Sequence, residues 1–221
     1  ADSACSATCA MLATPSWMAD FVGWTALLGK PYLGERFHDY RQCAEEVIRD
    51  ANITGIKFVF YYGHTRLGSE GADVDNGPAE DLGGERGFRA MVRRLHQNGI
   101  RVILLDHLHR WVNRDAPEYR RLRLHRYAKR DNGGNVMTIR KWSKETFLSC
   151  RYREGPTPVW VEMCPSCEGW RERYLRHVAR MIDLGVDGLE VDLFGPGAVC
   201  HNPAHAHPAG GIRPARRTPR R

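Results

Sequence analysis

Two carboxylates stand near the end of one apolar segment, Gly188-Leu-Glu-Val-Asp192. A helical pattern precedes this segment, and its length and composition are typical of a buried strand. Side chains alternate between the two faces of an extended chain, so Glu190 and Asp192 share one face and the apolar residues lie on the other. Burying two acids without partners would cost free energy. The sequence therefore predicts a solvated or strongly hydrogen-bonded site near the end of this strand.

Other side chains that could do chemistry follow the remaining predicted strands. In a parallel barrel the loops after the strands converge on one mouth, which holds the active site. The candidates in chain order are His64, Asp106, His107, His109, Trp111, Trp160 and Glu162. Cleavage of a glycosidic bond usually needs two carboxyl groups, about 5 to 5.5 Å apart for retention or roughly 6.5 to 9.5 Å apart for inversion. Acids and aromatic rings around one mouth thus favour a carbohydrate substrate.

Position within the predicted strands suggests a role for each candidate. Asp192, at a strand end, is expected to be the nucleophile or to stabilise the transition state, with Glu162 or Asp106 as its partner acid. The predicted substrate-binding residues are His64, His107, His109, Trp111, Trp160, Glu190, His205 and His207. The alternative for Glu190, which lies one layer deeper than Asp192, is a hydrogen-bonded structural anchor.

A second group of residues has side chains that suit zinc. It combines a Cys-x-x-Cys pair, Cys164 and Cys167, with a later pair, Cys200 and His201. Thiolates and imidazoles are the usual ligands of structural zinc, although this spacing is not that of a standard finger. The main prediction is that no metal or other cofactor is bound. The alternative is a zinc site made by these four residues in a non-catalytic zinc-stabilised or carbohydrate-binding module.

Helical and strand-like patterns alternate along the chain and must position these groups. Apolar residues recur at helical spacing in 40–48, 88–95 and 170–182. The expected strands are 21–24, 56–62, 101–106, 159–163 and 188–193. Between residues 110 and 150 the pattern is polar, and the turn signal Asp131-Asn-Gly-Gly134 suggests an inserted hairpin.

Apolar strands between helices predict a parallel sheet with both faces covered. A closed barrel of eight strands typically needs about 250 residues. The sequence therefore predicts an α/β fold of the (β/α)8 TIM-barrel type that is incomplete, with about five strands. A doubly wound open sheet is the alternative, but no Gly-rich phosphate loop follows any strand. The expected organisation is a flexible lead-in (1–16), a partial barrel domain (17–211) and a disordered tail rich in Arg and Pro (212–221).

Composition excludes two classes of partner. Of the net charge of +7, five positive charges come from arginines in the tail, which leaves 7 − 5 = +2 for the rest of the chain, so nucleic acid is not an expected partner. Nowhere are there the roughly 20 successive apolar residues that a membrane span requires. Seven cysteines, an odd number in a chain of this size, argue against a disulfide framework. Composition leaves the compartment and the oligomeric state open.

Two segments resemble strands of glycoside hydrolase barrels of the α-amylase and α-galactosidase type. They are Gly99-Ile-Arg-Val-Ile-Leu-Leu-Asp-His107 and Gly185-Val-Asp-Gly-Leu-Glu-Val-Asp192. The broader pattern, over roughly residues 17–211, is similar to uncharacterised bacterial glycoside-hydrolase-like barrel proteins. The motifs that carry it are Val22-Gly-Trp24, Asp75-Asn-Gly77, Leu82-Gly-Gly84, Met163-Cys-Pro165 with Trp170, and His201-Asn-Pro-Ala-His-Ala-His-Pro208 before Gly210-Gly211.

The resemblance implies an enzyme that hydrolyses O-glycosidic bonds of carbohydrate. Asp192 would match the strand-end aspartate that serves as nucleophile or substrate-binding acid, and the paired Cys and His residues would belong to substrate loops. The amylase pattern carries an Arg two residues before that aspartate, where this chain has Glu190. The acid/base carboxylate of such enzymes comes from a later strand, so an inactive barrel fragment is a further alternative.

Overall fold

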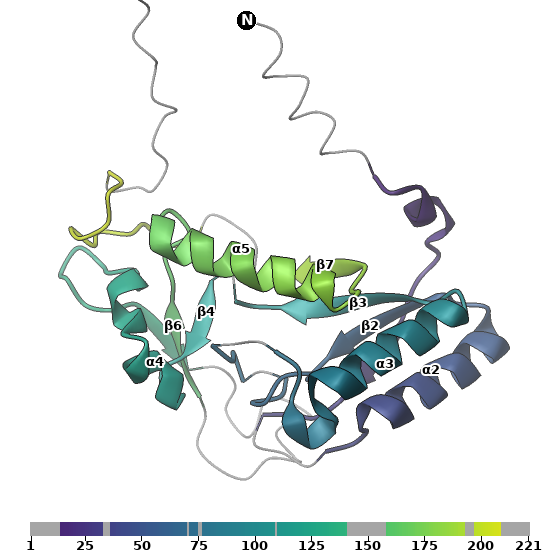
Figure 1. The fold of residues 1–221 in the computed structure, drawn as a ribbon. Helices are drawn as coiled ribbons and strands as arrows, with labels where there is room; N and C mark the ends of the chain where they lie inside the picture. Colours follow the sequence, from purple (N-terminus) through teal and green to yellow (C-terminus); the bar gives the residue numbers. More distant parts are fainter. Residues whose placement is uncertain are drawn as a thin grey trace, which may run out of the picture.

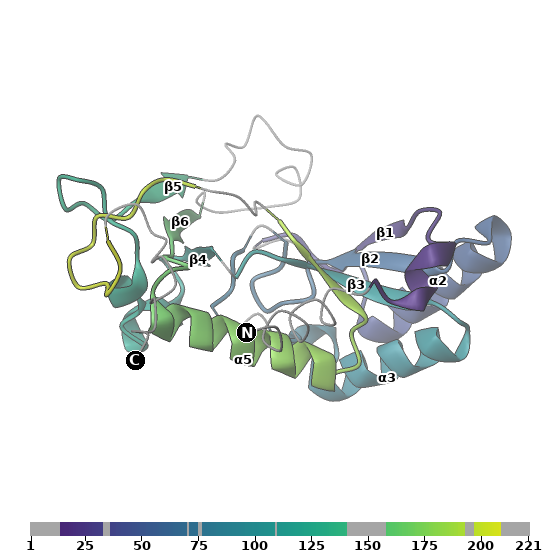
Figure 2. The ribbon, with the colours of Figure 1, turned by 90° about the horizontal axis from the view of Figure 1, so that it is seen from above.

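The protein contains two small sheets joined along one long helix (Figure 1). The computed structural model describes residues 14–32, 36–69, 71–74, 77–108, 110–140, 158–192 and 197–208. One sheet is parallel and has four strands, and the other is antiparallel and has three. Figures 1 and 2 show helix α5 (Glu168–Asp183) running from the antiparallel sheet to the parallel one.

The parallel sheet has the strand order β1-β2-β3-β7. Its strands are β1 (Thr25–Leu28), β2 (Phe58–Tyr62), β3 (Arg101–Asp106) and β7 (Gly188–Val191). Asp106 pairs with Val191, so the residues that follow, His107 and Asp192, leave the sheet at the same level. This register brings together two residues that are far apart in the sequence.

Two helices precede β2 and β3 and have clear local signals. Helix α2 (Tyr40–Thr54) starts with a capping box, in which Asp39 and Gln42 exchange hydrogen bonds between side chain and backbone. It ends at Gly55, whose φ of 75° is the left-handed conformation that glycine adopts at no steric cost. Helix α3 (Gly84–Gln97) follows a short 3-10 turn, η2 (Glu80–Leu82).

The three helices α2, α3 and α5 lie on one face of the parallel sheet (Figure 2). Alternate residues of β2 and β3 point towards them, and Tyr61, Val102 and Leu104 are buried with Phe88 of α3 in the main apolar core. The other face carries Phe60, Tyr62, Ile103 and Leu105, which are only half-buried. This face corresponds to the interior of a barrel, and Glu190 and Asp192 lie on it.

The antiparallel sheet is inserted between β3 and α5. Its order is β4-β6-β5, with β4 (Trp111–Asn113), β6 (Val159–Glu162) and β5 (Thr138–Arg140). Two short helical segments, α4 (Pro117–Arg121) and η3 (Leu124–Tyr127), lie between β4 and β5. Trp170 of α5 belongs to the core of this part, whereas Met181 of the same helix belongs to the main core. Helix α5 therefore holds the two parts together.

The predicted fold class is confirmed, because the structure is mixed α/β with a parallel sheet and only part of a barrel. Strands at 56–62, 101–106 and 188–193 lie where they were expected, within a few residues. The first strand lies at Thr25–Leu28 rather than at 21–24. A 3-10 turn, η1 (Ser16–Asp20), comes before residues 21–24, which are neither helix nor strand. Both faces of the sheet were expected to be covered, but within the described residues the face with Phe60 and Ile103 is only half-buried.

The strand expected at 159–163 is present, but its place in the parallel sheet was wrong. It pairs antiparallel with β4 and β5, and all four of its residues are buried. A short continuous apolar run is typical of any strand that is covered on both faces, so it does not indicate strand direction. The expected hairpin is confirmed by the antiparallel bridge between Arg130 and Val136 around the turn at 131–134.

Two expectations about the ends of the chain fall largely outside the described residues. The predicted lead-in is described only from residue 14 onward, and the predicted tail, 212–221, is not described. Within the described ranges, none of the helices has both the length and the apolar character that crossing a bilayer would demand.

Candidate functional site at the ends of β3 and β7

His107 and Asp192 meet where β3 and β7 end. The imidazole Nε2 of His107 lies 3.0 Å from Oδ2 of Asp192. The Asp192 backbone N–H donates to the Asp106 carbonyl at 3.1 Å, which fixes the strand end. The side chain of His107 is 9% exposed and that of Asp192 is 37% exposed. Asp192 is therefore a carboxylate at the rim of the open face, held by an imidazole and accessible to a ligand.

Glu190 lies on the same face, two residues before Asp192. Partial desolvation at the sheet surface and the neighbouring Asp192 carboxylate raise the pKa of Glu190, and His107 opposes this effect. Glu190 thus holds a proton more readily than an ordinary glutamate. A carboxyl group with a raised pKa beside a second carboxylate is a typical feature of acid-base sites.

Asp106 faces the opposite way and is fully buried beneath α5. Its Oδ1 accepts a hydrogen bond from the Leu108 N–H at 2.9 Å and lies 3.6 Å from His177 Nε2. Burial acts to raise the pKa of Asp106, but hydrogen bonds from His177, Leu108 and Tyr174, together with the His177 charge, lower it below the ordinary value. Asp106 therefore ties β3 to α5 on the helical side of the sheet.

The stabilising contribution of Asp106 is expected to depend on pH. A carboxyl group whose pKa is lowered by folding stabilises the fold above its unfolded pKa, and this stability is lost as pH falls through the folded pKa. We expect Asp106→Asn to lower the free energy of unfolding by about 1 to 3 kcal/mol at pH 7. The difference from the wild type should shrink below about pH 4. Urea unfolding of both proteins between pH 7 and pH 3 measures this, and a difference that stays constant with pH would contradict it.

Glu162 is buried in an ion cluster of the antiparallel sheet. Its Oε1 lies 2.6 Å from Lys129 Nζ and 3.0 Å from Arg110 Nε. The Glu162 and Lys129 side chains are 5% and 6% exposed. Gly197 lies directly over this carboxylate, because an added Cβ there would come within 2.8 Å of Glu162 Oε1. The geometry makes Glu162 a structural anion, shielded from solvent by its own partners.

Two tryptophans stand behind His107. The ring centroids of Trp160 and His107 are 5.1 Å apart, and those of Trp111 and Trp160 are 6.2 Å apart. Trp160 has no exposed surface and Trp111 is 5% exposed. Neither ring presents a face to solvent in this arrangement, so their contribution is to fix the orientation of the His107 imidazole.

His64 lies after β2 and is buried, with its ring near those of Tyr61 and Phe88. Together with His107 and Asp73 it lines a cavity of about 20 Å³. Such a volume has room for one water molecule but not for a sugar ring. The expected substrate contact of His109 lies outside the described residues.

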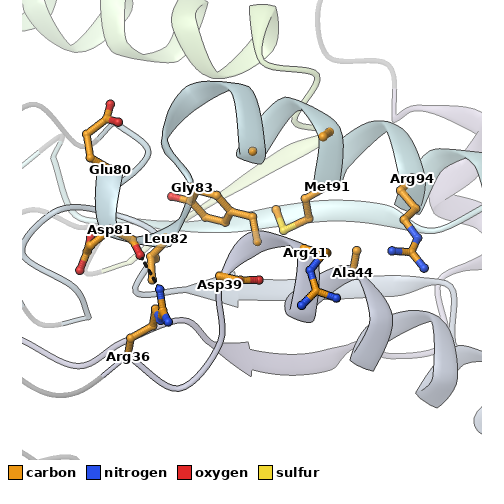
Figure 3. A pocket seen from close by; sticks show the side chains of 13 residues that line it. Arg36, Asp39, Arg41, Ala44, Glu80, Asp81, Leu82, Gly83, Met91 and Arg94 are labelled. Atoms are coloured by element: carbon orange, nitrogen blue, oxygen red, sulfur yellow. Dashed lines mark hydrogen bonds between the residues drawn. The ribbon is translucent and has the colours of Figure 1, made fainter.

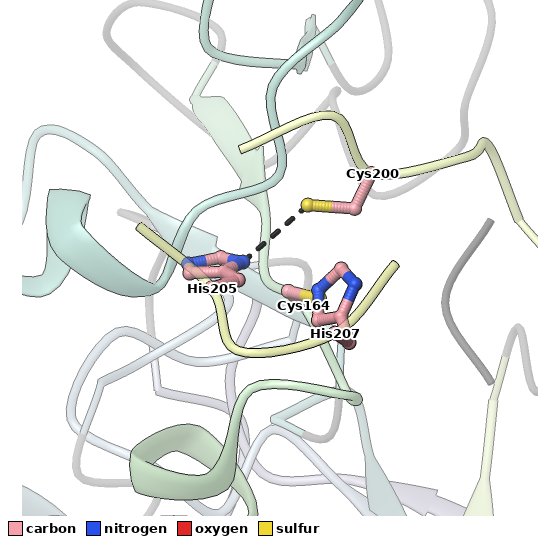
Figure 4. Close-up of side chains that lie close together, drawn as sticks. All are labelled: Cys164, Cys200, His205 and His207. Atoms are coloured by element: carbon pink, nitrogen blue, oxygen red, sulfur yellow. Dashed lines mark hydrogen bonds between the residues drawn. The ribbon is translucent and has the colours of Figure 1, made fainter. Parts of the chain in front are cut away.

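Cysteine and histidine side chains converge at the far end of the antiparallel sheet (Figure 4). They are Cys164, Cys200, His205 and His207, whose ligand atoms all lie within 4.8 Å of one another. The sequence pointed to Cys164 and Cys200 but paired them with Cys167 and His201. Cys167 instead caps the start of α5, and His201 is exposed. His205 and His207, expected to bind substrate, belong to this cluster.

A further cavity lies between α2 and α3 on the outer helical layer (Figure 3). It has a volume of about 530 Å³, and none of the residues predicted from the sequence to act in catalysis or binding lines it. Arg36 Nη1 donates to the Asp81 carbonyl at its edge, at 2.9 Å. Asp192 lines neither this cavity nor the one beside His64.

The structure brings together only some of the residues predicted from the sequence. Glu190, Asp192 and His107 share one face, whereas Asp106 and Glu162 are each enclosed elsewhere. No sequence pattern identified the four partners that enclose these two acids, namely His177, Tyr174, Lys129 and Arg110. Tyr174 and His177 are three residues apart in a helical pattern and so share one face of α5, but nothing in that spacing identifies the buried acid they contact.

Comparison with known families gives one match over most of the chain. The profile of the family described as "Domain of unknown function (DUF6259)" matches residues 4–213. No curated protein matches the sequence.

Solved structures of glycoside hydrolases share the fold. The α-N-acetylgalactosaminidase of Bifidobacterium bifidum, in complex with GalNAc, superposes with a TM-score of 0.60 at 15% identity, over 81% of this chain and 29% of that enzyme. A maltogenic α-amylase of Thermotoga neapolitana gives 0.55 at 18% identity, over 77% of this chain and 38% of the amylase. The trehalose-6-phosphate hydrolase of Bacillus licheniformis gives 0.55 at 12%, over 80% and 36%. The chain thus spans about a third of the length of these enzymes and has the fold of part of their barrels.

Proposed function

The chain belongs to the family described as Domain of unknown function (DUF6259), and we propose that it forms the nucleophile-bearing part of a glycoside hydrolase. The observation that carries this proposal is the position of Asp192. It is a half-exposed carboxylate at the carboxyl end of a parallel strand, on the interior face, 3.0 Å from the His107 imidazole. Active sites of parallel barrels lie at this end of the strands.

Asp192 acts as the nucleophile in this proposal. A carboxylate oxygen of Asp192 forms a bond to the anomeric carbon as the bond from that carbon to the leaving oxygen breaks, and water later releases the sugar. His107 holds the carboxylate in position, since its ring is fixed by Trp160 and hydrogen-bonds to Asp192. Glu190, two residues earlier, binds the sugar from the same side.

The proton donor to the leaving oxygen must lie across from β7. Hydrolysis requires carboxyl groups on the two sides of the glycosidic bond, whereas Glu190 and Asp192 approach a sugar from one strand. Glu162 and Asp106, the two partner acids considered from the sequence, are enclosed by their own partners. We therefore assign the acid/base to an element that faces the open side of the sheet.

The open face also indicates where that element packs. Phe60, Tyr62, Ile103 and Leu105 are half-buried on it, and Trp24 is 52% exposed. In a closed barrel such residues fill the interior in layers. Further strand and helix units against this face would bury them and complete the mouth around Asp192.

For the substrate we propose an α-linked sugar. The B. bifidum relative acts on α-N-acetylgalactosaminides and the T. neapolitana relative is an α-amylase. Both α-galactose-type and α-glucose-type substrates therefore belong in the first test.

Covalent trapping tests the nucleophile directly. Fluorinated glycosyl fluorides of the α-N-acetylgalactosamine, α-galactose and α-glucose series lose fluoride as the sugar attaches to the nucleophile, and the attached sugar is released slowly. We expect the intact mass to rise by one fluoroglycosyl group, and peptide mapping to place it on Asp192. Asp183→Asn, the same change at an exposed aspartate of α5, should leave labelling unchanged.

Three results would contradict the proposal. Attachment to another carboxylate, or hydrolysis of nitrophenyl glycosides with no covalent label, would remove Asp192 as the nucleophile. If the protein shows neither labelling nor hydrolysis with any of the three sugars, Asp192 is not a nucleophile towards these substrates.

A further inference from the structure

We propose that Cys164, Cys200, His205 and His207 bind one structural zinc ion. The Cys164 sulfur lies 3.1 Å from Nε2 of His207, and the Cys200 sulfur lies 3.4 Å from Nδ1 of His205 (Figure 4). Zinc bonds of about 2.3 Å to sulfur and about 2.0 to 2.1 Å to nitrogen place tetrahedral ligand atoms roughly 3.3 to 3.8 Å apart. The four atoms therefore need only small side-chain rotations to surround the ion.

Both histidines are oriented as zinc ligands are. The ring nitrogen of His205 that faces away from the sulfurs, Nε2, lies 2.9 Å from the Arg126 carbonyl. In His207 the outward nitrogen is Nδ1, 2.9 Å from the Pro208 carbonyl. A carbonyl can only accept, so these two contacts are hydrogen bonds when the outward nitrogens carry the protons, which is the tautomer that a metal on the inward nitrogens selects. Asn202 Nδ2, which donates to the Ala128 carbonyl, also lies 3.1 Å from Nε2 of His205. The inward nitrogens then present lone pairs to the centre of the cluster, which is the usual outer support of a metal-bound histidine.

The two sulfurs are also shielded from solvent. Cys164 is 1% and Cys200 is 3% exposed, and neither forms a disulfide. The backbone N–H groups of Ser166 and Cys167 donate to the Cys164 sulfur, where the chain turns into α5. Two buried thiolates would repel each other, and a divalent cation between them neutralises both.

Four protein ligands indicate a structural rather than a catalytic ion, because catalytic zinc keeps a position open for water. Cys164 follows β6, whereas the other three ligands lie in the loop 197–208, which comes after β7. This loop already contacts the inserted segment, since the His201 N–H donates to the Arg130 carbonyl and Asn202 Nδ2 to the Ala128 carbonyl. Zinc would clamp the segment that follows Asp192 to the antiparallel sheet.

The donor types favour zinc over other metals. Two sulfurs and two imidazole nitrogens in a tetrahedral arrangement are typical of structural zinc, and the absence of carboxylates from the cluster disfavours magnesium, calcium and manganese. Sequence spacing alone suggested a different ligand set, with Cys167 and His201, but Cys167 packs against an apolar core and His201 is exposed outside the cluster.

Metal content of the purified protein tests the proposal without any assay of activity. Protein expressed in zinc-supplemented medium and purified without chelators should contain one zinc per chain by plasma mass spectrometry. Replacement by Co²⁺ should give the strong visible absorption of tetrahedral cobalt together with a thiolate-to-cobalt charge-transfer band. A chelator that removes the ion should lower the melting temperature.

Matched variants locate the site. His207→Ala, at a half-exposed position, and Cys164→Ser should each lose stoichiometric zinc. His201→Ala and Cys167→Ser, the same substitutions at neighbouring positions outside the cluster, should retain one zinc. If Cys164→Ser fails to fold, the cobalt spectrum of the wild type and the zinc content of His207→Ala still decide the question.

Several outcomes would overturn the proposal. They are wild-type protein without stoichiometric zinc, zinc that survives His207→Ala, zinc lost equally from His201→Ala, stoichiometric iron or copper in place of zinc, and a disulfide between Cys164 and Cys200 seen by mass spectrometry without reduction. None of them depends on whether Asp192 is a nucleophile, so failure here and failure of the proposed function are separate results.

Discussion

Replacing Asp192 by asparagine is expected to lower the rate of glycoside hydrolysis by about 10³-fold or more, because removal of a covalent nucleophile abolishes the reaction path that it opens. The free energy of unfolding of this variant should hardly change. The Asp192 side chain is 37% exposed, and asparagine has the same shape and can still hydrogen-bond to His107. For such exposed positions the free energy of unfolding usually changes by no more than about 0.5 kcal/mol.

The measurement is kcat/KM on the best nitrophenyl glycoside, together with a urea unfolding curve for each protein. Asp183→Asn is the control, since it makes the same chemical change at an exposed site on α5. Hydrolysis at near wild-type rate in Asp192→Asn would show that another group attacks the sugar. Loss of hydrolysis together with a large loss of stability would point instead to a structural role.

The sequence predicted the parallel strands because their signals are local. Each is a short run of apolar and β-branched residues after a helical pattern, and the alternation within 188–192 placed both acids on one face. The same alternation separates Asp106 from His107, because adjacent residues of a strand face opposite sides. Whether Asp106 or His107 points towards the helices depends on the packing of α5. The α5 residues that contact Asp106, His177 and Tyr174, lie about 70 residues later in the chain.

The cluster of cysteines and histidines also depends on contacts between distant segments, which the local sequence pattern does not show. Residue types identified Cys164 and Cys200, which do lie together. The choice between His201 and the later histidines depends on how the loop 197–208 lies against residues 126–130, and this is a contact between distant segments. The sequence likewise did not show the direction of strand β6. Burial on both faces removes the alternation of apolar and polar residues that would have distinguished an inserted antiparallel strand.

The buried ion cluster around Glu162 gives the second large expected effect. Glu162→Gln should lower the free energy of unfolding by about 3 to 5 kcal/mol, since it leaves the buried Lys129 ammonium without its counter-charge. Lys129 Nζ and Arg110 Nε are 2.6 and 3.0 Å from the carboxylate, and Lys129 is 5% exposed. Urea unfolding at neutral pH measures the loss.

Glu85→Gln is a matched control for this change. Glu85 also contacts two cations, Arg89 at 3.0 Å and Arg180 at 3.3 Å, but it is exposed. Solvent screens exposed ion pairs, so Glu85→Gln should cause only a small loss of stability. A similar small loss in Glu162→Gln, accompanied by loss of hydrolysis, would contradict the structural role and restore Glu162 as the partner acid that the sequence first suggested.

A double variant tests whether uncompensated charge or disturbed packing causes the instability of Glu162→Gln. If Glu162→Gln destabilises the fold through uncompensated charge, then Lys129→Met in the same protein removes a cation that has lost its counter-charge. It should therefore recover part of the lost free energy of unfolding. The two changes together should therefore cost less than the sum of their separate effects, with an interaction energy of about 0.5 to 3 kcal/mol. Simple additivity would mean that the glutamine disturbs packing rather than charge balance. Lys129 also donates to the Ala198 carbonyl at 2.9 Å, so the recovery should be incomplete, because that contact to the loop after β7 is lost in the double variant.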